Sequence, residues 1–266
     1  WRRLVDMLVD VGADRECVVV AFGGGATLDL AGFVAAAYLR GVRWIGVPTT
    51  LLAQVDAAHG GKTGVDHPAA KNLVGAFHPP ESVLCDTNLL ATLPEREVAG
   101  GLAEVVKHGV ISGAELLRRA GRDDPAALVA AAARVKLGIV ERDPLERGER
   151  RVLNLGHTLG HAFERASDYA LHHGEAVALG LRAACAIAAS HCNFGGRADV
   201  EAALDRCALP KTAALSTDVV RAALRHDKKR RGKTLRWALP VRIGDVRIYE
   251  DVPDELVTSA IRDVCS

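Results

Sequence analysis

The first third of the chain alternates between short apolar runs and amphipathic stretches. Leu4, Leu8 and Val11 recur at helical spacing, which predicts an amphipathic helix over 1–16. The continuous apolar run CVVVAF at 17–22 predicts a strand that is buried on both faces of a parallel sheet. The same pattern predicts a helix over 28–38, strands over 44–48 and 82–86, and a long irregular segment over 53–80.

Helical periodicity dominates the rest of the chain. We expect a domain boundary near residues 93–96, with an α/β domain over 1–94 and a mainly α-helical domain over 95–266. The elements predicted in the second domain are helices over 97–111, 125–142, 158–166, 174–190 and 218–225, and strands over 236–241 and 246–250.

Composition narrows the class of protein. The chain has 34 Lys+Arg against 33 Asp+Glu, so it gives no reason to expect nucleic acid or an anionic membrane as a partner. Its six scattered cysteines are typical of reduced thiols in a cytoplasmic protein, and no apolar run reaches the roughly 20 residues needed to span a membrane. Because the chain starts at Trp1, already inside a helical pattern, we expect it to lack N-terminal sequence.

The glycine run GGGATLD follows the first predicted strand and opens a helix. Glycines at such a place let backbone N–H groups approach a pyrophosphate, and the N-terminus of the helix favours its negative charge. The spacing is not GxGxxG, so a tight strand-to-helix turn without a ligand explains the run equally well.

Histidines gather in two later segments. His157 and His161 lie four residues apart on one helical face, and His172 and His173 open the next helix. Histidines at this spacing can bind a divalent metal, for which Glu104 could supply a carboxylate from an apolar helix. Structural histidines in hydrogen bonds are the commoner alternative, and the residues alone leave both interpretations open.

Basic and amide side chains in polar contexts suggest an anion site, because Lys and Arg bind phosphate through charge-assisted hydrogen bonds. Lys107 and Lys136 lie within largely apolar helices, where a lysine needs an anionic partner or a shifted pKa. The other candidates are Lys62, Lys71, Asn72, Arg150, Asn154, Lys228 and Lys229.

Six motifs, taken in order, resemble the 3-dehydroquinate synthase family of sugar-phosphate cyclases over roughly residues 23–240. They are GGGATLDLAGF, YLRGVRWIGVPTTLLAQVDAAHGGKTGVDHPAAKNLVGAFHPP, TLPEREVAGGLAEVVKHG, RVLNLGHTLGHAFE, HHGEAVALG and HDKKRRGKTLRWALP. The resemblance implies a Rossmann-like N-terminal domain, a helical C-terminal domain and an active site between them. It also implies NAD, a divalent metal (Zn²⁺ or Co²⁺) and a homodimer.

The resemblance assigns roles to individual residues. The implied metal ligands are Glu104, His157 and His173, with His161 facing the substrate instead. The implied NAD contacts are Gly25, Ala26, Thr27, Leu28, Asp29, Thr49, Thr50, Lys62, Lys71, Leu89, Leu90, Ala91 and Thr92. The implied catalytic and substrate-binding residues are Asp56, Lys62, Asn72, Lys107, Lys136, Arg150, Asn154, His161 and Lys228 or Lys229, with Arg40 reaching the neighbouring subunit's site.

The implied substrate is 3-deoxy-arabino-heptulosonate 7-phosphate, which the family converts to 3-dehydroquinate and phosphate in the shikimate pathway without net redox change. The sequence departs from the family pattern at Leu28, where a glycine is usual and where we expect crowding of the turn, and at Ala57 and Ala58, where serines are usual. The alternatives are a related cyclase such as aminodehydroquinate synthase, a metal-dependent polyol dehydrogenase, or a non-catalytic truncated subunit.

Overall fold

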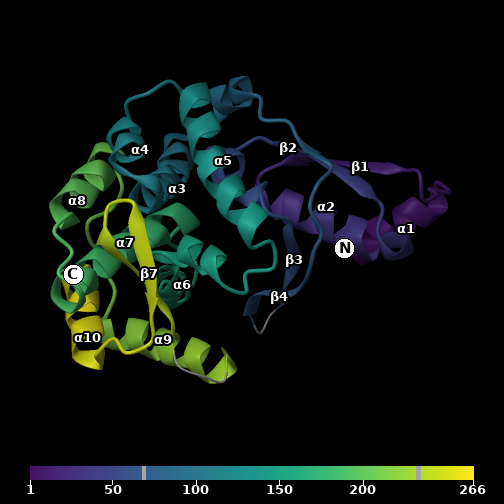
Figure 1. Cartoon of the computed structure of the whole chain (residues 1–266). Helices are drawn as coiled ribbons and strands as arrows, with labels where there is room; N and C mark the ends of the chain where they lie inside the picture. The colour runs from purple at the N-terminus through teal and green to yellow at the C-terminus, as the bar shows by residue number, and fades with distance from the viewer. Residues whose placement is uncertain (68–69, 232–234) are drawn as a thin grey trace.

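The computed structural model describes residues 1–67, 70–231 and 235–266, and side chains only outside 68–72 and 226–234. A parallel sheet with strand order β1-β2-β5 forms the framework near the N-terminus (Figure 1). Its strands are β1 (Val18–Gly23), β2 (Arg43–Pro48) and β5 (Ser82–Val83). Helix α2 (Gly25–Ala37) joins β1 to β2, so the carboxyl ends of the strands share one edge, as the α/β pattern predicts.

The prediction that β1 is buried on both faces is wrong for one face. Val20 and Phe22 are 61% and 62% exposed, whereas Ala21 is buried. The valine-rich run therefore predicted the strand but not its covering, because β-branched residues also suit a strand that is buried on one face only. The predicted strand over 82–86 is also shorter, and a 3-10 helix, η3 (Thr87–Thr92), follows it.

The segment over 53–80, predicted to be irregular, contains regular structure. It forms a π-helical turn, η2 (Ala53–Ala57), and an antiparallel hairpin of β3 (Lys62–His67) and β4 (Ala70–Phe77). Gly64 and Gly75 face each other across the hairpin, and a Cβ on Gly75 would lie 2.2 Å from the Thr63 carbonyl oxygen. These glycines permit the close pairing and also hide the alternation of apolar residues that predicts a strand.

The second part of the chain is mainly helical, as predicted. The expected helices are α3 (Glu95–Ser112), α5 (Pro125–Arg142), α6 (His157–Ala166), α7 (His173–His191) and α9 (Thr217–Arg231). The expected strands are β6 (Trp237–Arg242) and β7 (Asp245–Tyr249), which form a hairpin. In this part the sequence did not predict α4 (Ala114–Arg119), η4 (Glu149–Asn154), α8 (Arg197–Arg206) and α10 (Asp254–Asp263), and earlier in the chain it also did not predict η1 (Tyr38–Arg40). The first helix, α1 (Arg2–Asp10), ends earlier than expected.

Helix α7 lies at the centre of the larger hydrophobic core and packs against α3, α6, α8, α10 and β6. A smaller core lies between the sheet and α2, around Leu28, Ala35 and Trp44. None of the helices described is both long and apolar enough to cross a membrane. The β3–β4 hairpin packs against α2 and lies on the side of the α/β part that faces the helical region (Figure 1).

Candidate active site

A cavity of about 650 Å³ opens between the hairpin and the helical region. The hairpin and η2 line one side, and α3, α5, α6, α7 and η4 line the other. The cavity brings together these predicted residues: Asp29, Asp56, Lys62, Lys107, Lys136, Arg150, Asn154, His157, His161 and His173. Residues that are distant in sequence therefore converge on one space, which is typical of an enzyme active site.

Glu104, His157 and His173 come from three different helices and meet at one wall of the cavity. The Glu104 Oε1 atom lies 3.5 Å from His157 Nε2 and 3.3 Å from His173 Nε2. Glu104 is fully buried, and neither of its carboxylate oxygens accepts a well-aligned hydrogen bond from a described residue. A buried carboxylate faced by two imidazole nitrogens is a donor set that suits Zn²⁺ or Co²⁺.

The other ring nitrogen of each histidine, Nδ1, has a hydrogen-bond partner. His157 Nδ1 lies 3.1 Å from the Leu155 carbonyl oxygen, and His173 Nδ1 lies 3.4 Å from Glu164 Oε1. A hydrogen bond at Nδ1 leaves the Nε2 lone pair facing Glu104, as in metal sites whose ligands are oriented from behind. The residues present therefore fit a divalent metal.

Glycines next to the candidate ligands let the three helices approach closely. A Cβ on Gly174 would lie 2.2 Å from Gly100 Cα, so α7 and α3 touch through their backbones. A Cβ on Gly160 would lie 3.3 Å from the Ala176 carbonyl oxygen, so α6 and α7 are close as well. Gly156 precedes His157 in a left-handed conformation with φ +78°, which an L side chain rarely adopts.

His161 lies beside this group but is not part of it. Its ring centroid is 5.5 Å from that of His157 and 6.4 Å from that of His173. The spacing of four residues suggested His161 as the partner of His157, whereas the ligand atoms that converge with His157 belong to Glu104 and His173. The resemblance therefore grouped these side chains better than helical spacing did.

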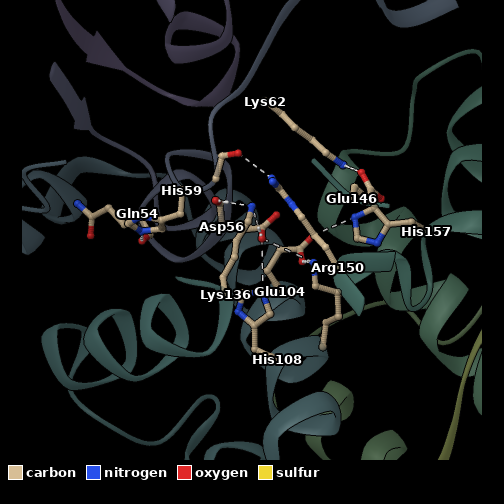
Figure 2. Close-up of polar contacts among 12 residues, drawn as sticks. Gln54, Asp56, His59, Lys62, Glu104, His108, Lys136, Glu146, Arg150 and His157 are labelled. Carbon is tan, nitrogen blue, oxygen red and sulfur yellow. Dashed lines mark hydrogen bonds and ion pairs between the residues drawn. The ribbon is translucent and has the colours of Figure 1, made fainter. Parts of the chain in front are cut away.

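A network of buried charges lies next to Glu104, and Figure 2 shows its members converging. Lys107 Nζ is 2.5 Å from Glu104 Oε2 and 3.7 Å from Asp56 Oδ1. Lys136 Nζ is 2.8 Å from Asp56 Oδ1 and 2.7 Å from the Asp56 carbonyl oxygen. The π-helical turn η2 holds Asp56 at this point, so the network joins η2 to α3 and α5.

Opposite charges outweigh burial in setting the ionisation of the two carboxylates. Burial alone would raise the pKa of Asp56, but Lys107 and Lys136 hold that pKa well below its ordinary value. Burial would likewise raise the pKa of Glu104, and Lys107 holds it well below. For Lys136 burial dominates, so its pKa is lowered despite Asp56. The network therefore holds ionised carboxylates in a largely dry site, where electrostatic interactions are strong.

Predicted anion-binding residues from β3 and η4 also line the cavity. Lys62 on β3 forms an ion pair with Glu146 (Figure 2). The same carboxylate accepts a hydrogen bond of 2.6 Å from Asn154 Nδ2. Arg150 is 2% exposed and donates to the carbonyl oxygens of Pro144, at 2.5 Å, and Gly60, at 2.8 Å. Arg150 therefore also ties η4 to the turn that leads into the hairpin.

The predicted NAD contacts that the structure describes lie mostly after the carboxyl ends of the parallel strands. The glycine turn follows β1, Thr49 and Thr50 follow β2, and η3 carries Leu89, Leu90, Ala91 and Thr92 after β5. Gly24 precedes α2, with Ala26 and Thr27 exposed beside it, so backbone groups at the start of this helix are accessible. This arrangement fits a dinucleotide at the strand edge.

The expected crowding at Leu28 is wrong. Its side chain is 1% exposed and packs in the smaller core, so it points away from the turn. At the other departure from the family pattern, the neighbouring His59 is buried, and its Nε2 lies 2.8 Å from the Gln54 carbonyl oxygen. Arg40 is exposed on η1, away from this cavity. The side chains of Lys71, Asn72, Lys228 and Lys229 lie outside the described residues.

Sequence reasoning missed three residues of the site. His108 is fully buried, with its Nε2 3.4 Å from Asp56 Oδ1, and it directly follows the predicted Lys107. Glu164 follows His157 by seven residues, which places both on one face of α6 and was a usable signal. Glu146 lies in the turn before η4 with φ 57°, and no pattern in the sequence pointed to it.

Comparisons with known proteins agree on the family. Residues 1–100 match the family 3-dehydroquinate synthase N-terminal, and residues 101–230 match 3-dehydroquinate synthase C-terminal. The 3-dehydroquinate synthase of Symbiobacterium thermophilum is 47% identical over 92% of this chain and 72% of its own length. That of Halorhodospira halophila is 43% identical over 97% of this chain and 77% of its own length.

Solved structures of cyclases have the same fold. A 2-epi-5-epi-valiolone synthase from Streptomyces hygroscopicus subsp. jinggangensis, with NAD⁺ and Zn²⁺ bound, is similar with a TM-score of 0.89 and 29% identity over 99% of this chain and 78% of its own. A 2-deoxy-scyllo-inosose synthase complexed with carbaglucose-6-phosphate, NAD⁺ and Co²⁺ has a TM-score of 0.90 and 29% identity, over the same shares of the two chains. Two family matches that together span most of the sequence, and relatives above 40% identity, show that this chain belongs to the 3-dehydroquinate synthase family.

Proposed function

We propose that the chain is a 3-dehydroquinate synthase that converts 3-deoxy-arabino-heptulosonate 7-phosphate to 3-dehydroquinate and phosphate. The observation that carries this function is the meeting of Glu104, His157 and His173 beside the buried lysines Lys107 and Lys136. The higher identity to 3-dehydroquinate synthases, 47%, than to the solved cyclases with other names, 29%, favours this substrate over the related ones.

NAD and a divalent metal complete the proposed site. When bound, NAD would supply reversible hydride transfer from and back to the ring carbon C5 of the substrate, with no net redox change. Glu104, His157 and His173 would hold the metal, which would supply Lewis-acid chemistry. The buried ammonium groups of Lys107 and Lys136 stabilise negative charge at the same place, because the site holds them in a fixed position and a low dielectric.

Phosphate recognition is assigned to residues of β3 and η4. Lys62, Arg150 and Asn154 supply the positive charge and N–H donors that a phosphate ester needs. Glu146 pairs with both Lys62 and Asn154 and thereby joins β3 to η4 at this part of the cavity. The task of the protein is then mainly to position the substrate and stabilise its charges.

Release of inorganic phosphate from the heptulosonate phosphate tests the proposed function. We expect release that needs both NAD and Zn²⁺ or Co²⁺, and stops when a chelator removes the metal. The product should be 3-dehydroquinate, identified by chromatography, without accumulation of NADH. Accumulating NADH would instead indicate a polyol dehydrogenase, and preference for the amino-substituted substrate would indicate an aminodehydroquinate synthase. No turnover, together with no metal binding, would indicate a non-catalytic subunit.

The assignment of Arg150 has its own test. Arg150→Ala removes a charge-assisted contact of about 1.5–3 kcal/mol, which weakens substrate binding roughly ten- to a hundredfold. NAD affinity, measured by calorimetry, should change little, and Arg150→Lys should recover part of the substrate affinity. Because Arg150 also bonds to two carbonyl groups, the melting temperature of each variant must be measured too. Unchanged substrate affinity in a folded Arg150→Ala variant contradicts the assignment.

We further propose a cytoplasmic homodimer with a domain boundary near residues 94 and 95, between η3 and α3. Arg40 is exposed, and both Leu39 and Arg40 have left-handed backbone, with φ 47° and 68°. Strained backbone of this kind concentrates at functional sites and supports a role for Arg40 in the neighbouring subunit. If Arg40 acts across the dimer, mixing the inactive Arg40→Ala and Lys107→Met proteins should restore partial activity. A mixture that is as inactive as the two separate variants would contradict this role of Arg40.

A further inference from the structure

We propose that Glu164 is a positioning residue of the metal site, which orients His173 and strengthens it as a ligand. Glu164 is 3% exposed on α6, and its Oε1 lies 3.4 Å from His173 Nδ1. The other nitrogen of the same ring, Nε2, lies 3.3 Å from Glu104 Oε1. The inference rests on the proposed function, because it assumes that His173 binds a metal.

The contact determines which nitrogen of His173 carries the proton. An ionised carboxylate can only accept a hydrogen bond, so Glu164 requires N–H at Nδ1. The Nε2 lone pair of neutral His173 then faces Glu104, in the direction that a metal ligand needs. Glu164 therefore selects the tautomer of His173 that can bind a cation at the common point.

The two candidate histidine ligands are supported differently. His157 Nδ1 has a neutral carbonyl group as its partner, that of Leu155 at 3.1 Å, whereas His173 has a carboxylate. A negative charge behind the ring makes the imidazole a stronger donor and offsets part of the charge of a bound cation. Loss of the Glu164 charge should therefore weaken metal binding even where the ring keeps its place.

The fold explains why α6 carries this glutamate. Residues seven apart complete about two turns, so His157 and Glu164 share one face of α6. Gly160 lies between them and lets α7 approach that face, since a Cβ there would lie 3.3 Å from the Ala176 carbonyl oxygen. One helix thus supplies a ligand directly and also supports the ligand that comes from α7.

The experiment compares Glu164→Gln and Glu164→Leu with the unmodified chain. Gln keeps an acceptor of the same shape without the charge, and Leu removes both. Each protein is stripped of metal, and its affinity for Zn²⁺ is measured by competition with a chromophoric chelator. We expect Zn²⁺ affinity to fall about 10–100-fold in the Leu variant and less in the Gln variant. The visible spectrum of bound Co²⁺ should also change, since it reports ligand geometry.

Glu97→Gln is the matched control. Glu97 makes the same kind of contact, with its Oε1 2.8 Å from Nδ1 of His172, a ring outside the three-ligand group. We expect Glu97→Gln to leave Zn²⁺ affinity within about twofold of the unmodified chain. An equal loss in Glu97→Gln and Glu164→Gln would overturn the inference, because it would reflect general charge rather than contact with His173.

The melting temperature of the metal-free proteins separates positioning from folding. Weaker Zn²⁺ binding with an unchanged metal-free melting temperature supports the inference. Zn²⁺ affinity equal to that of the unmodified chain in a folded Leu variant overturns it. Where the Leu variant does not fold, the Gln variant decides in the same way. An unmodified chain that binds no Zn²⁺, or that keeps it after His157→Ala, would contradict the proposed metal site itself and not the role of Glu164.

Discussion

The helical wall of the cavity and the glycine turn of the sheet are built on different principles. The helical wall carries buried side chains of opposite charge, such as Glu104 and Lys107, and Lys107 also faces Asp56 on η2. The turn after β1 is made of backbone and small residues, with Ala26 and Thr27 exposed. The helical wall depends on pairing between several charged groups, whereas the glycine turn depends only on space at the start of a helix.

This difference predicts where substitutions should lower stability most. Removing one member of a buried charge network leaves its partners without compensation in a low dielectric, so the loss is large and spreads to stability. Changing a residue near the exposed turn affects mainly the ligand that lies there and leaves the core intact. The three predictions below test the contrast from its largest expected effect to its smallest.

Lys107→Met should have the largest effect. It leaves the ionised carboxylates of Asp56 and Glu104 with less compensation, and we expect the free energy of unfolding at pH 7 to fall by about 3–5 kcal/mol. Both carboxylates have lowered pKa values, so the stability that they contribute is present above their ordinary pKa and is lost as the pH falls. The difference in the free energy of unfolding between Lys107→Met and the unmodified chain should therefore narrow near pH 4.

Urea denaturation of the metal-free proteins measures this gap, with Lys211→Met as the control. Lys211 pairs with Asp205 at the surface, where its side chain is 71% exposed, so its loss should change stability by less than about 1 kcal/mol. Equal losses in the two variants would remove the distinction between the helical wall and an ordinary surface.

Gly174→Ala should have an intermediate effect that is specific to the helical wall. The new Cβ would lie 2.2 Å from Gly100 Cα, so α7 must move away from α3 and take His173 with it. We expect a loss of about 1–3 kcal/mol in stability and weaker Zn²⁺ binding. Gly100→Ala is the control, because its Cβ would lie 3.8 Å from Gly174 Cα, in ordinary contact. Comparable Zn²⁺ affinity in the two alanine variants would show that this backbone contact does not set the site.

Asp29→Asn should have the smallest effect, and of opposite sign. Burial, only partly offset by Lys136, raises the pKa of Asp29 from 3.8 to about 6. A raised pKa means that Asp29 contributes most stability below pH 3.8 and loses that contribution as the pH rises through 6. Asparagine, which never ionises, should therefore stabilise the fold by about 1–2 kcal/mol at pH 7.5. This figure is about half of the free energy that corresponds to the whole pKa shift, because solvent screens a partly exposed side chain.

Thermal unfolding of Asp29→Asn across pH 3–8 checks this prediction. The gain should disappear below pH 4, where Asp29 is protonated in both folded and unfolded chains. A gain that is independent of pH would show that the substituted amide acts by a new hydrogen bond and not by removing a charge.

The sequence was informative where local pattern determines structure. The apolar runs at 17–22 and 44–48 became β1 and β2, and the long amphipathic stretches became α3, α5, α6 and α7. It failed where glycine pairing hid the β3–β4 hairpin and where short helices such as α4 and α8 bury few residues. It also failed for the burial of β1, which depends on what packs against the strand and not on the strand itself.

The residues of the candidate site also divide into those that local sequence pattern predicted and those that it did not. Lys107 and Lys136 were identified from the residues alone, because a lysine in an apolar helix needs a partner. Glu104, His157 and His173 were all candidates from the residues alone, but only the resemblance selected these three as one group, since no local rule connects three separate helices. Glu146 was not predicted, because its contacts with Lys62 and Asn154 arise from tertiary structure and a left-handed backbone.

The separation of the candidate metal ligands along the chain has a consequence for protein synthesis. About 70 residues lie between Glu104 and His173, so the ribosome adds the second roughly 3–14 s after the first, at about 5–20 residues per second. A motif with both ligands on one turn of helix can capture a cation as soon as that helix emerges. In this chain the three candidate side chains cannot meet until α7 has left the ribosome and packed against α3, so all three cannot hold one cation before that point of synthesis.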